Sequence, residues 1–167
     1  MTAADVVRFC EALGKRRVHI WIDGGWGVDA LLGRQTRPHE DLDIVVEEKD
    51  VGAARALLDE WGYRDVPRDD TRPWNFVMGD GRGHEVDFHV IVLDEGGNGV
   101  YGPGRFTYPA GSLAGAGSID GHAVKCIAAD HMIRFHTGYA LREKDFHDVW
   151  ALCERFRLDM PDEYRWR

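Results

Sequence analysis

The chain has 167 residues, of which 44% are hydrophobic and 30% are charged, and its formal net charge is −8 at pH 7. This length fits one domain with a hydrophobic core, or one domain with a modest appendage. The acidic balance disfavours an extended nucleic-acid partner, because phosphate backbones bind to basic surfaces. It suits a small cationic ligand drawn to an acidic cleft.

The apolar pattern disfavours a membrane-bound or exported protein. No apolar run approaches the roughly 20 residues of a membrane span, so we expect no membrane partner. Residues 1–5 lack the basic and then apolar pattern of a signal peptide, which makes the cytoplasm the expected location. The cysteines Cys10, Cys126 and Cys153 are odd in number and far apart, so we expect buried thiols.

The first half of the chain alternates predicted helices and strands, with Gly24 and Gly25 at a strand-to-helix turn. Hydrophobic periodicity and the position of Gly33 give the following order: a helix over 5–15, a strand over 18–23, a short helix over 27–32, a polar loop over 34–40, a strand over 41–46 and an amphipathic helix over 49–61.

The second half begins with a predicted hairpin, in which strands over 74–78 and 84–93 flank the glycine-rich turn 79–83. Alternation in its second strand places Val86 and Phe88 on one face and Asp87 and His89 on the other. This strand therefore combines an apolar face with a polar one.

The segment 96–121 contains nine of the chain's twenty glycines and predicts one long irregular loop that serves as an active-site loop or lid. A tight turn at 119–122 leads into a strand over 123–127, and helices over 128–136 and 142–156 close the chain. The order of elements predicts an α+β fold with helices packed on a mixed sheet.

Three carboxylates are the strongest candidates for chemistry. Asp41 and Asp43, separated by one residue on a predicted strand, point to the same face. Two carboxylates in close proximity need a compensating cation, and oxygen-ligated divalent ions supply one and also handle phosphoryl groups. Asp87, on the polar face of a later strand, is the best candidate to complete the site.

Gly24 and Gly25 precede these acids by about twenty positions, and backbone N–H groups at such a turn can approach phosphate oxygens. Alone, a glycine pair is often a plain turn, and an Asp-x-Asp sequence is often a turn or cap. The joint occurrence of glycines, paired acids and a later acid, in this order, indicates metal-dependent chemistry on a nucleotide.

At these residues the chain resembles the nucleotidyltransferases of the polymerase-β-like superfamily. The stretches 21–29 and 37–43 resemble more narrowly the small antibiotic nucleotidyltransferases, above all the lincosamide type and next the aminoglycoside 2″ type. The stretches 124–127 and 135–139 also resemble the lincosamide group, whereas 94–118 matches it loosely. The resemblance implies a single nucleotidyltransferase domain over 1–167, with the C-terminal helices, about 128–167, as an appendage.

The resemblance further implies transfer of a nucleoside monophosphate from a nucleoside triphosphate to a hydroxyl of a small cationic antibiotic, with two Mg²⁺ ions as cofactor. Asp41, Asp43 and Asp87 correspond to the metal ligands and catalytic residues, and Gly24 and Gly25 to the phosphate-binding turn. Whether a homodimer completes the active sites stays an open question.

Other polar residues are weaker candidates, because each has an ordinary structural role as an alternative. For the nucleotide they are Arg37, which could also be a solvated loop charge, His39, which could hydrogen-bond the loop, and Lys144, which could pair with a local acid. For the acceptor substrate they are Asp29, His89, His136 and Tyr139, whose alternatives are capping or surface roles, strand hydrogen bonding and helix packing.

Three other functions remain open from the sequence. The acceptor could be a protein side chain or a tRNA end, although the acidic balance disfavours tRNA. A non-catalytic nucleotide-binding module would use the turn at Gly24 and Gly25 to bind a nucleotide but would catalyse no reaction. A metallohydrolase could use His84, Glu85, Asp87 and His89, but strand alternation turns His84 away from Glu85.

Overall fold

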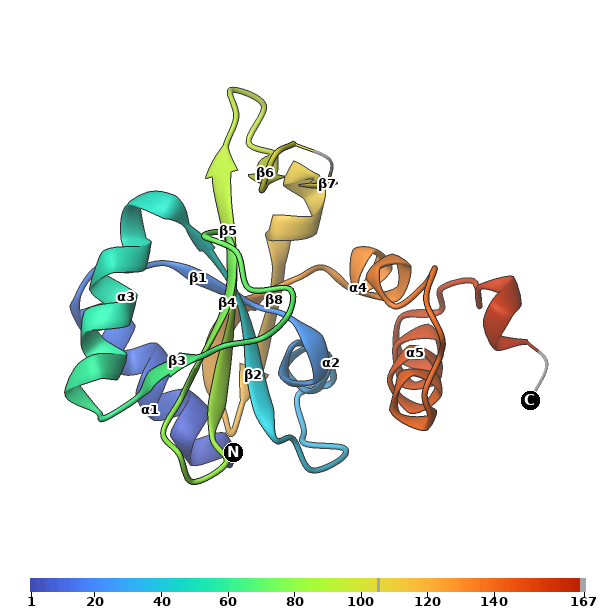
Figure 1. Cartoon of the computed structure of the whole chain (residues 1–167). Helices are drawn as coiled ribbons and strands as arrows, with labels where there is room; N and C mark the ends of the chain where they lie inside the picture. Colours follow the sequence, from blue (N-terminus) through green and yellow to red (C-terminus); the bar gives the residue numbers. More distant parts are fainter. Residues whose placement is uncertain (105, 166–167) are drawn as a thin grey trace.

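The computed structural model describes residues 1–104 and 106–165, which form a mixed sheet between two groups of helices. Figure 1 shows α1 and α3 on one face of the sheet and α2, α4 and α5 on the other. The five helices are α1 (Ala3–Lys15), α2 (Gly24–Leu32), α3 (Glu48–Glu60), α4 (Ala129–Phe135) and α5 (Glu143–Phe156), with 3₁₀ turns η1 (Ala110–Ala114) and η2 (Asp162–Tyr164).

The nine described strands belong to one sheet, whose order is β3-β4-β5-β2-β1-β9-β8, with β6 paired to β5 and β7 to β6. Their bounds are β1 (Ile20–Ile22), β2 (Asp41–Glu47), β3 (Arg64–Val66), β4 (Asn75–Gly79), β5 (Glu85–Leu93), β6 (Gly99–Tyr101), β7 (Phe106–Tyr108), β8 (Gly115–Ile119) and β9 (His122–Cys126). The central strands β2 and β5 are parallel, and β1 runs antiparallel to β2.

Each face of the sheet has its own hydrophobic cluster. Leu42 and Ile44 of β2 join residues of α1 and α3 in one buried cluster, whereas Val45 joins residues of α4 and α5 in the other. Because side chains alternate along a strand, Asp43 must share the face of Val45. The acids of β2 therefore lie on the side of α2, α4 and α5.

Helix α2 begins directly at Gly24, three residues earlier than predicted, because Asp23 caps it and accepts the N–H of Gly24 at 2.8 Å. Gly33, in the left-handed conformation, ends the helix as expected. The helix packs closely on the edge strand β8, where a Cβ on Gly117 would lie 2.2 Å from the carbonyl oxygen of Ala30. Glycine at this position lets the two backbones touch.

The α+β architecture and most predicted elements are confirmed, but the single irregular loop over 96–121 is wrong. Within the described residues it contains β6, β7, η1 and β8, and residue 105 lies outside them. Short strands rich in glycine leave no alternating pattern long enough to recognise. Strand β3 contains no glycine and was not predicted because three residues are too few to show alternation.

The closing helices α4 and α5 follow β9 and lie beyond α2, as Figure 1 shows. Residues 166–167 of the predicted appendage lie outside the described residues. The boundary near residue 128, between the domain and its C-terminal appendage, stays a prediction. Among the described helices, none combines the length and apolar character that a membrane span needs.

Candidate active site

The register of two parallel strands brings the predicted acids together. Asp43 of β2 lies directly beside Asp87 of β5, and Asp41 lies beside Glu85. In a parallel pair, residues in register project from the same face, so the carboxylates of Asp43 and Asp87 are neighbours. The structure therefore brings these two predicted site residues together.

The raised pKa values of Asp87 and Asp41 indicate a site that favours a bound cation. Burial, together with the charges of Asp43 and Asp41, raises the pKa of Asp87 to about 6. Its Oδ1 atom is buried, and no hydrogen-bond partner reaches it from the described residues. Partial desolvation and the charge of Asp43 also raise the pKa of Asp41. A buried carboxylate oxygen without a donor is costly unless a cation binds there.

His89 supplies part of the positive charge. Its Nε2 lies 3.8 Å from Oδ1 of Asp43. Although burial works to lower the pKa of His89, the carboxylates of Asp43, Asp23 and Asp87 raise it to about 9. Burial alone would raise the pKa of Asp43, but contact with His89 and the charge of Lys144 hold it below its usual value.

Possible metal-ligand atoms of Asp43, Asp87 and His89 lie within 4.8 Å of one another. Within the described part of the chain, this is the one group of three such residues, and Asp41 lies outside it. Two carboxylates, one of them with an unpartnered oxygen, are a donor set that fits a divalent cation. Asp41 lies two residues before Asp43 on the same face of β2.

The two glycines allow the N-terminus of α2 to lie against the acids. A Cβ on Gly24, whose φ is +54°, would lie 2.0 Å from Oδ2 of Asp43. A Cβ on Gly25 would lie 2.5 Å from both Nη2 of Arg37 and Nδ1 of His39. The free N–H groups and the dipole of a helix N-terminus attract phosphate. Acids for a metal and donors for a phosphate are thus adjacent.

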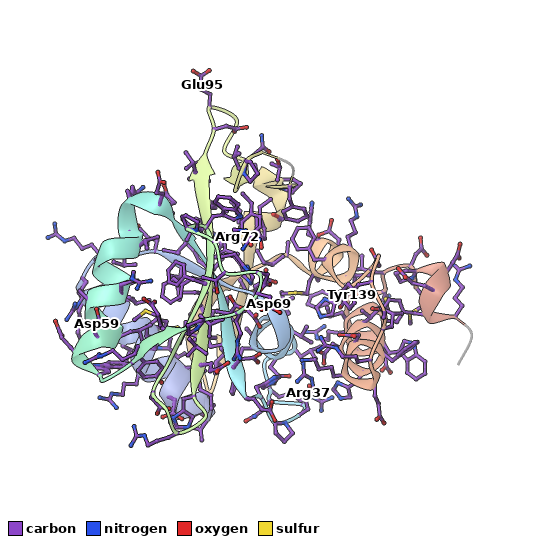
Figure 2. All side chains as sticks on the ribbon, viewed as in Figure 1. Arg37, Asp59, Asp69, Arg72, Glu95 and Tyr139 are labelled. Atoms are coloured by element: carbon purple, nitrogen blue, oxygen red, sulfur yellow. The ribbon has the colours of Figure 1, made fainter. Side chains whose placement is uncertain are left out.

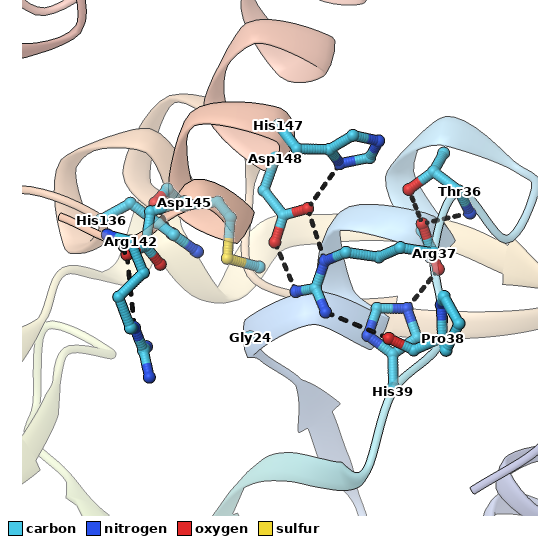
Figure 3. A network of polar contacts seen from close by, with 12 residues as sticks. Gly24, Thr36, Arg37, Pro38, His39, His136, Arg142, Asp145, His147 and Asp148 are labelled. Atoms are coloured by element: carbon cyan, nitrogen blue, oxygen red, sulfur yellow. Dashed lines mark hydrogen bonds and ion pairs between the residues drawn. The ribbon is translucent and has the colours of Figure 1, made fainter.

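Arg37 lies over this helix N-terminus but is already paired. Its Nε and Nη2 donate to the carboxylate of Asp148 on α5 at 3.0 and 2.6 Å (Figure 3). The hydrogen bond with Asp148 also raises the pKa of Arg37. The predicted contact of Arg37 with a triphosphate stays a prediction, and it would require the guanidinium to share or exchange this partner.

Asp29 and His39 form a buried pair below the site. Their side chains are each 2% exposed, and Nε2 of His39 lies 2.5 Å from Oδ2 of Asp29. The other oxygen of Asp29 accepts the N–H and hydroxyl of Thr36 (Figure 3). These bonds fix the loop that leads into β2. The structure therefore buries both side chains, and their predicted ligand contacts would need this loop to open.

An aromatic cavity of about 360 Å³ opens beside Asp43 and the start of α2. It is lined by Asp23, Gly24, Asp43, His89, Tyr101, Phe106, Tyr108, Phe135 and His136. The predicted acceptor residues His89 and His136 thus share one cavity. The four aromatic rings come from β6, β7 and α4, and Phe106, Tyr108 and Phe135 pack edge to face with centroids 5.2–5.3 Å apart.

Tyr139 and Lys144 lie at the α4–α5 side of the site. Tyr139 is absent from the residues that line the aromatic cavity, and its hydroxyl donates to Asp145 at 3.2 Å. Figure 2 shows Tyr139 beside the connection between these helices. Lys144 is exposed, but its charge opposes the rise in the pKa of Asp41 and helps to lower the pKa of Asp43. Lys144 therefore acts electrostatically on the predicted metal ligands.

A second cavity, of about 250 Å³, lies on the other side of the acids and includes Asp41 and Asp87. Arg68 in its wall pairs with Glu85 at 2.7 and 2.8 Å. His84 pairs with Asp80 in the hairpin turn, so the four residues of the metallohydrolase alternative do not form one cage.

Sequence reasoning missed the buried Asp23 and the aromatic residues of the cavity. Asp23 is 8% exposed and accepts the hydroxyl of Tyr108 at 3.3 Å. Its signal was available, because an aspartate before a helix start is a frequent N-cap. The clustering of Tyr101, Phe106 and Tyr108 depends on short strand pairings that the glycine-rich sequence does not reveal.

Comparisons with known proteins agree with this geometry. A family model described as aminoglycoside-2″-adenylyltransferase matches residues 5–152. A lincosamide resistance protein of Staphylococcus haemolyticus is 29% identical over 159 residues, which cover 89% of this chain and 92% of the relative. A 2″-aminoglycoside nucleotidyltransferase of Escherichia coli is 40% identical over 57 residues, or 34% of this chain and 32% of that protein.

Two solved structures share the fold. The lincosamide antibiotic adenylyltransferase LnuA, bound to lincomycin, has a TM-score of 0.79 and 24% identity, and the match covers 91% of this chain and 96% of LnuA. ANT(2″)-Ia, in complex with adenylyl-2″-tobramycin, has a TM-score of 0.73 and 24% identity, with 92% and 88% coverage. The predicted α+β nucleotidyltransferase fold is confirmed. Because the family model matches most of its length, the chain belongs to the aminoglycoside-2″-adenylyltransferase family and is a nucleotidyltransferase.

Proposed function

We propose that this protein transfers a nucleoside monophosphate, in the first place from ATP, to a hydroxyl of a small antibiotic and releases pyrophosphate. The observation that carries the proposal is the juxtaposition of Asp43 and Asp87, in register on parallel strands, with the N-terminus of α2 at Gly24. Metal ligands and phosphate donors side by side are what transfer of a nucleotidyl group requires.

In this mechanism Asp41, Asp43 and Asp87 would together hold two Mg²⁺ ions. When bound, the ions would neutralise phosphate charge and lower the pKa of the acceptor hydroxyl. The N–H groups at the start of α2, with Gly24 and Gly25, bind and orient the triphosphate. We expect Asp87, which lies beside Asp43 in the strand register, also to accept the proton of the attacking hydroxyl.

The aromatic cavity favours a lincosamide as the acceptor. Its wall offers the rings of Tyr101, Phe106, Tyr108 and Phe135, and its carboxylates are Asp23 and the predicted metal ligand Asp43. Such a surface binds a compact molecule with an apolar face and one amine better than a molecule that carries many ammonium groups. The alignment of the Staphylococcus haemolyticus relative over 89% of this chain supports the same acceptor class.

The test is direct. Incubation of the purified protein with Mg²⁺, each of the four ribonucleoside triphosphates and either lincomycin or tobramycin should yield a drug that is heavier by one nucleoside monophosphate in mass spectrometry. We expect ATP and lincomycin to give the highest kcat/KM, together with equimolar pyrophosphate. Faster modification of tobramycin would replace the lincosamide assignment, and no modified drug with any nucleotide would remove the antibiotic as acceptor.

Three further expectations belong to this proposal. Use of ATP fits a cytoplasmic location. Labelled nucleotide should reach no protein or tRNA in a cell lysate, since the net charge of −8 disfavours an extended nucleic-acid partner. A homodimer is a prediction that light scattering of the purified protein would test.

A further inference from the structure

Strand β5 places a histidine beside the predicted metal ligands. His89 lies two residues after Asp87, so both side chains project from the same face of the sheet. The parallel partner β2 presents Asp43 beside Asp87 and Val45 beside His89. Nε2 of His89 and Oδ1 of Asp43 are 3.8 Å apart, and one ligand atom from each of the three residues falls within 4.8 Å of the others.

These separations suit ligands of one ion. Bonds of roughly 2.1 Å place neighbouring ligand atoms on an octahedral ion about 3.0 Å apart and opposite ones about 4.2 Å apart, so the group must contract by about 1–2 Å to hold one ion. The His89 ring is held from the side by Tyr101, with centroids 6.0 Å apart. In the described part of the chain, the partner of the His89 imidazole is the carboxylate of Asp43, itself a predicted ligand, so the contact that a metal ion would replace lies within the site.

The chemistry of the donor set differs from an all-carboxylate site. Mg²⁺ prefers oxygen ligands, whereas Mn²⁺ and later transition ions also accept imidazole nitrogen. Asp41, the third acid of the sequence motif, lies outside the compact group, and His89 occupies the corresponding third position. A site built from Asp43, Asp87 and His89 therefore combines two oxygen donors and one nitrogen donor.

We propose that His89 is a direct ligand of the divalent cation held between Asp43 and Asp87, and that this nitrogen makes the protein bind Mn²⁺ in preference to Mg²⁺. The inference rests on the proposed function for the presence of a divalent ion. It adds a ligand and a metal preference that the three-carboxylate motif does not supply.

Pulsed electron paramagnetic resonance of the protein loaded with one equivalent of Mn²⁺ tests the ligand directly. We expect ¹⁴N modulation from a coordinated imidazole in the wild-type protein and its loss in His89→Phe, which keeps an aromatic ring beside Tyr101. The control is His136→Phe, because His136 lines the same cavity, lies outside the group of three and hydrogen-bonds to the carbonyl of Met132 through Nδ1. This control should retain the modulation.

Calorimetric titration gives a second readout. We expect His89→Phe to weaken Mn²⁺ binding on the order of tenfold while Mg²⁺ binding changes much less. Circular dichroism and the melting temperature establish that the variant is folded. Wild-type protein that binds Mn²⁺ through Asp43, as Asp43→Asn shows, but lacks ¹⁴N modulation would overturn the inference.

Failure of this inference and failure of the proposed function are distinguishable. Drug modification by wild-type protein without nitrogen coordination would leave the transferase and remove His89 as a ligand. Nitrogen coordination without drug modification would keep the metal site and remove the antibiotic acceptor.

Discussion

The two walls of the active site are built in different ways. The acidic wall comes from two neighbouring strands and the start of one helix, and the register of β2 with β5 fixes its geometry. The aromatic wall comes from β6, β7 and α4, with Tyr101, Phe106, Tyr108 and Phe135 packed edge to face. In the proposed mechanism, the acidic wall carries the chemistry common to all acceptors, and the aromatic wall presents the surface that an acceptor would contact.

This difference separates the expected effects of substitutions. Changes in the acidic wall should lower kcat with any acceptor, because metal and phosphate binding are common to every reaction of the site. Changes in the aromatic wall should raise KM for the acceptor and leave KM for the nucleotide unchanged.

The largest effect is expected for Asp43→Asn. Loss of one charge between Asp87 and the start of α2 should lower kcat at least about 100-fold, because electrostatic stabilisation of the transferred phosphate is lost. The fold should remain, since the substitution is nearly isosteric. Steady-state kinetics with circular dichroism measure both properties, and near-normal turnover would show that the metal lies elsewhere. Asp41→Asn should behave in the same way.

Gly24→Ala should impair both binding and stability. A Cβ at this position would collide with Oδ2 of Asp43, and φ is +54°. We expect a loss of about 1–3 kcal/mol in the free energy of unfolding and weaker ATP binding. Gly121→Ala is the matched control, because its φ is +78° but nothing lies within 4 Å of the added Cβ. Equal ATP affinity in the two variants would contradict the role of Gly24.

Phe135→Ala probes the aromatic wall. Removal of this ring from Phe106 and Tyr108 should raise KM for the acceptor roughly tenfold, with KM for ATP unchanged. Phe156→Ala, an exposed position on α5, serves as the control. A rise in KM for ATP instead would mean that this wall contacts the nucleotide base.

The most gradual effect concerns pH. The metal-free protein holds a proton on Asp87 below about pH 6 and on His89 below about pH 9, and a bound cation must displace both. Metal affinity should therefore rise with pH through both values, about tenfold per pH unit for each proton displaced. In His89→Phe only the proton on Asp87 has to be displaced, so the rise should be shallower, and it should end at a pH above 6 because the charge of His89 no longer lowers the pKa of Asp87. Calorimetry across pH 5–9 measures the two profiles.

The sequence predicted the acidic wall better than the aromatic one, and the reason is physical. Alternation along a strand is local, so Asp41, Asp43 and Asp87 could be assigned to one face without coordinates. The pairing of Arg37 with Asp148 joins residues 111 positions apart and leaves no local pattern. The early start of α2 was missed because glycine is a poor helix former, and the capping role of Asp23 outweighs that preference here.

The contact of Gly117 with the backbone of Ala30 has a consequence for catalysis at a distance. The helix whose N-terminus is aimed at the acids rests on the main chain of an outer strand, without intervening side chains that could change rotamer. The orientation of α2 relative to β8 therefore depends on direct contact between the backbones at Ala30 and Gly117. We expect one extra methyl group at position 117 to displace the helix and with it the proposed phosphate-binding N-terminus, although Gly117 lies on β8, outside the candidate site.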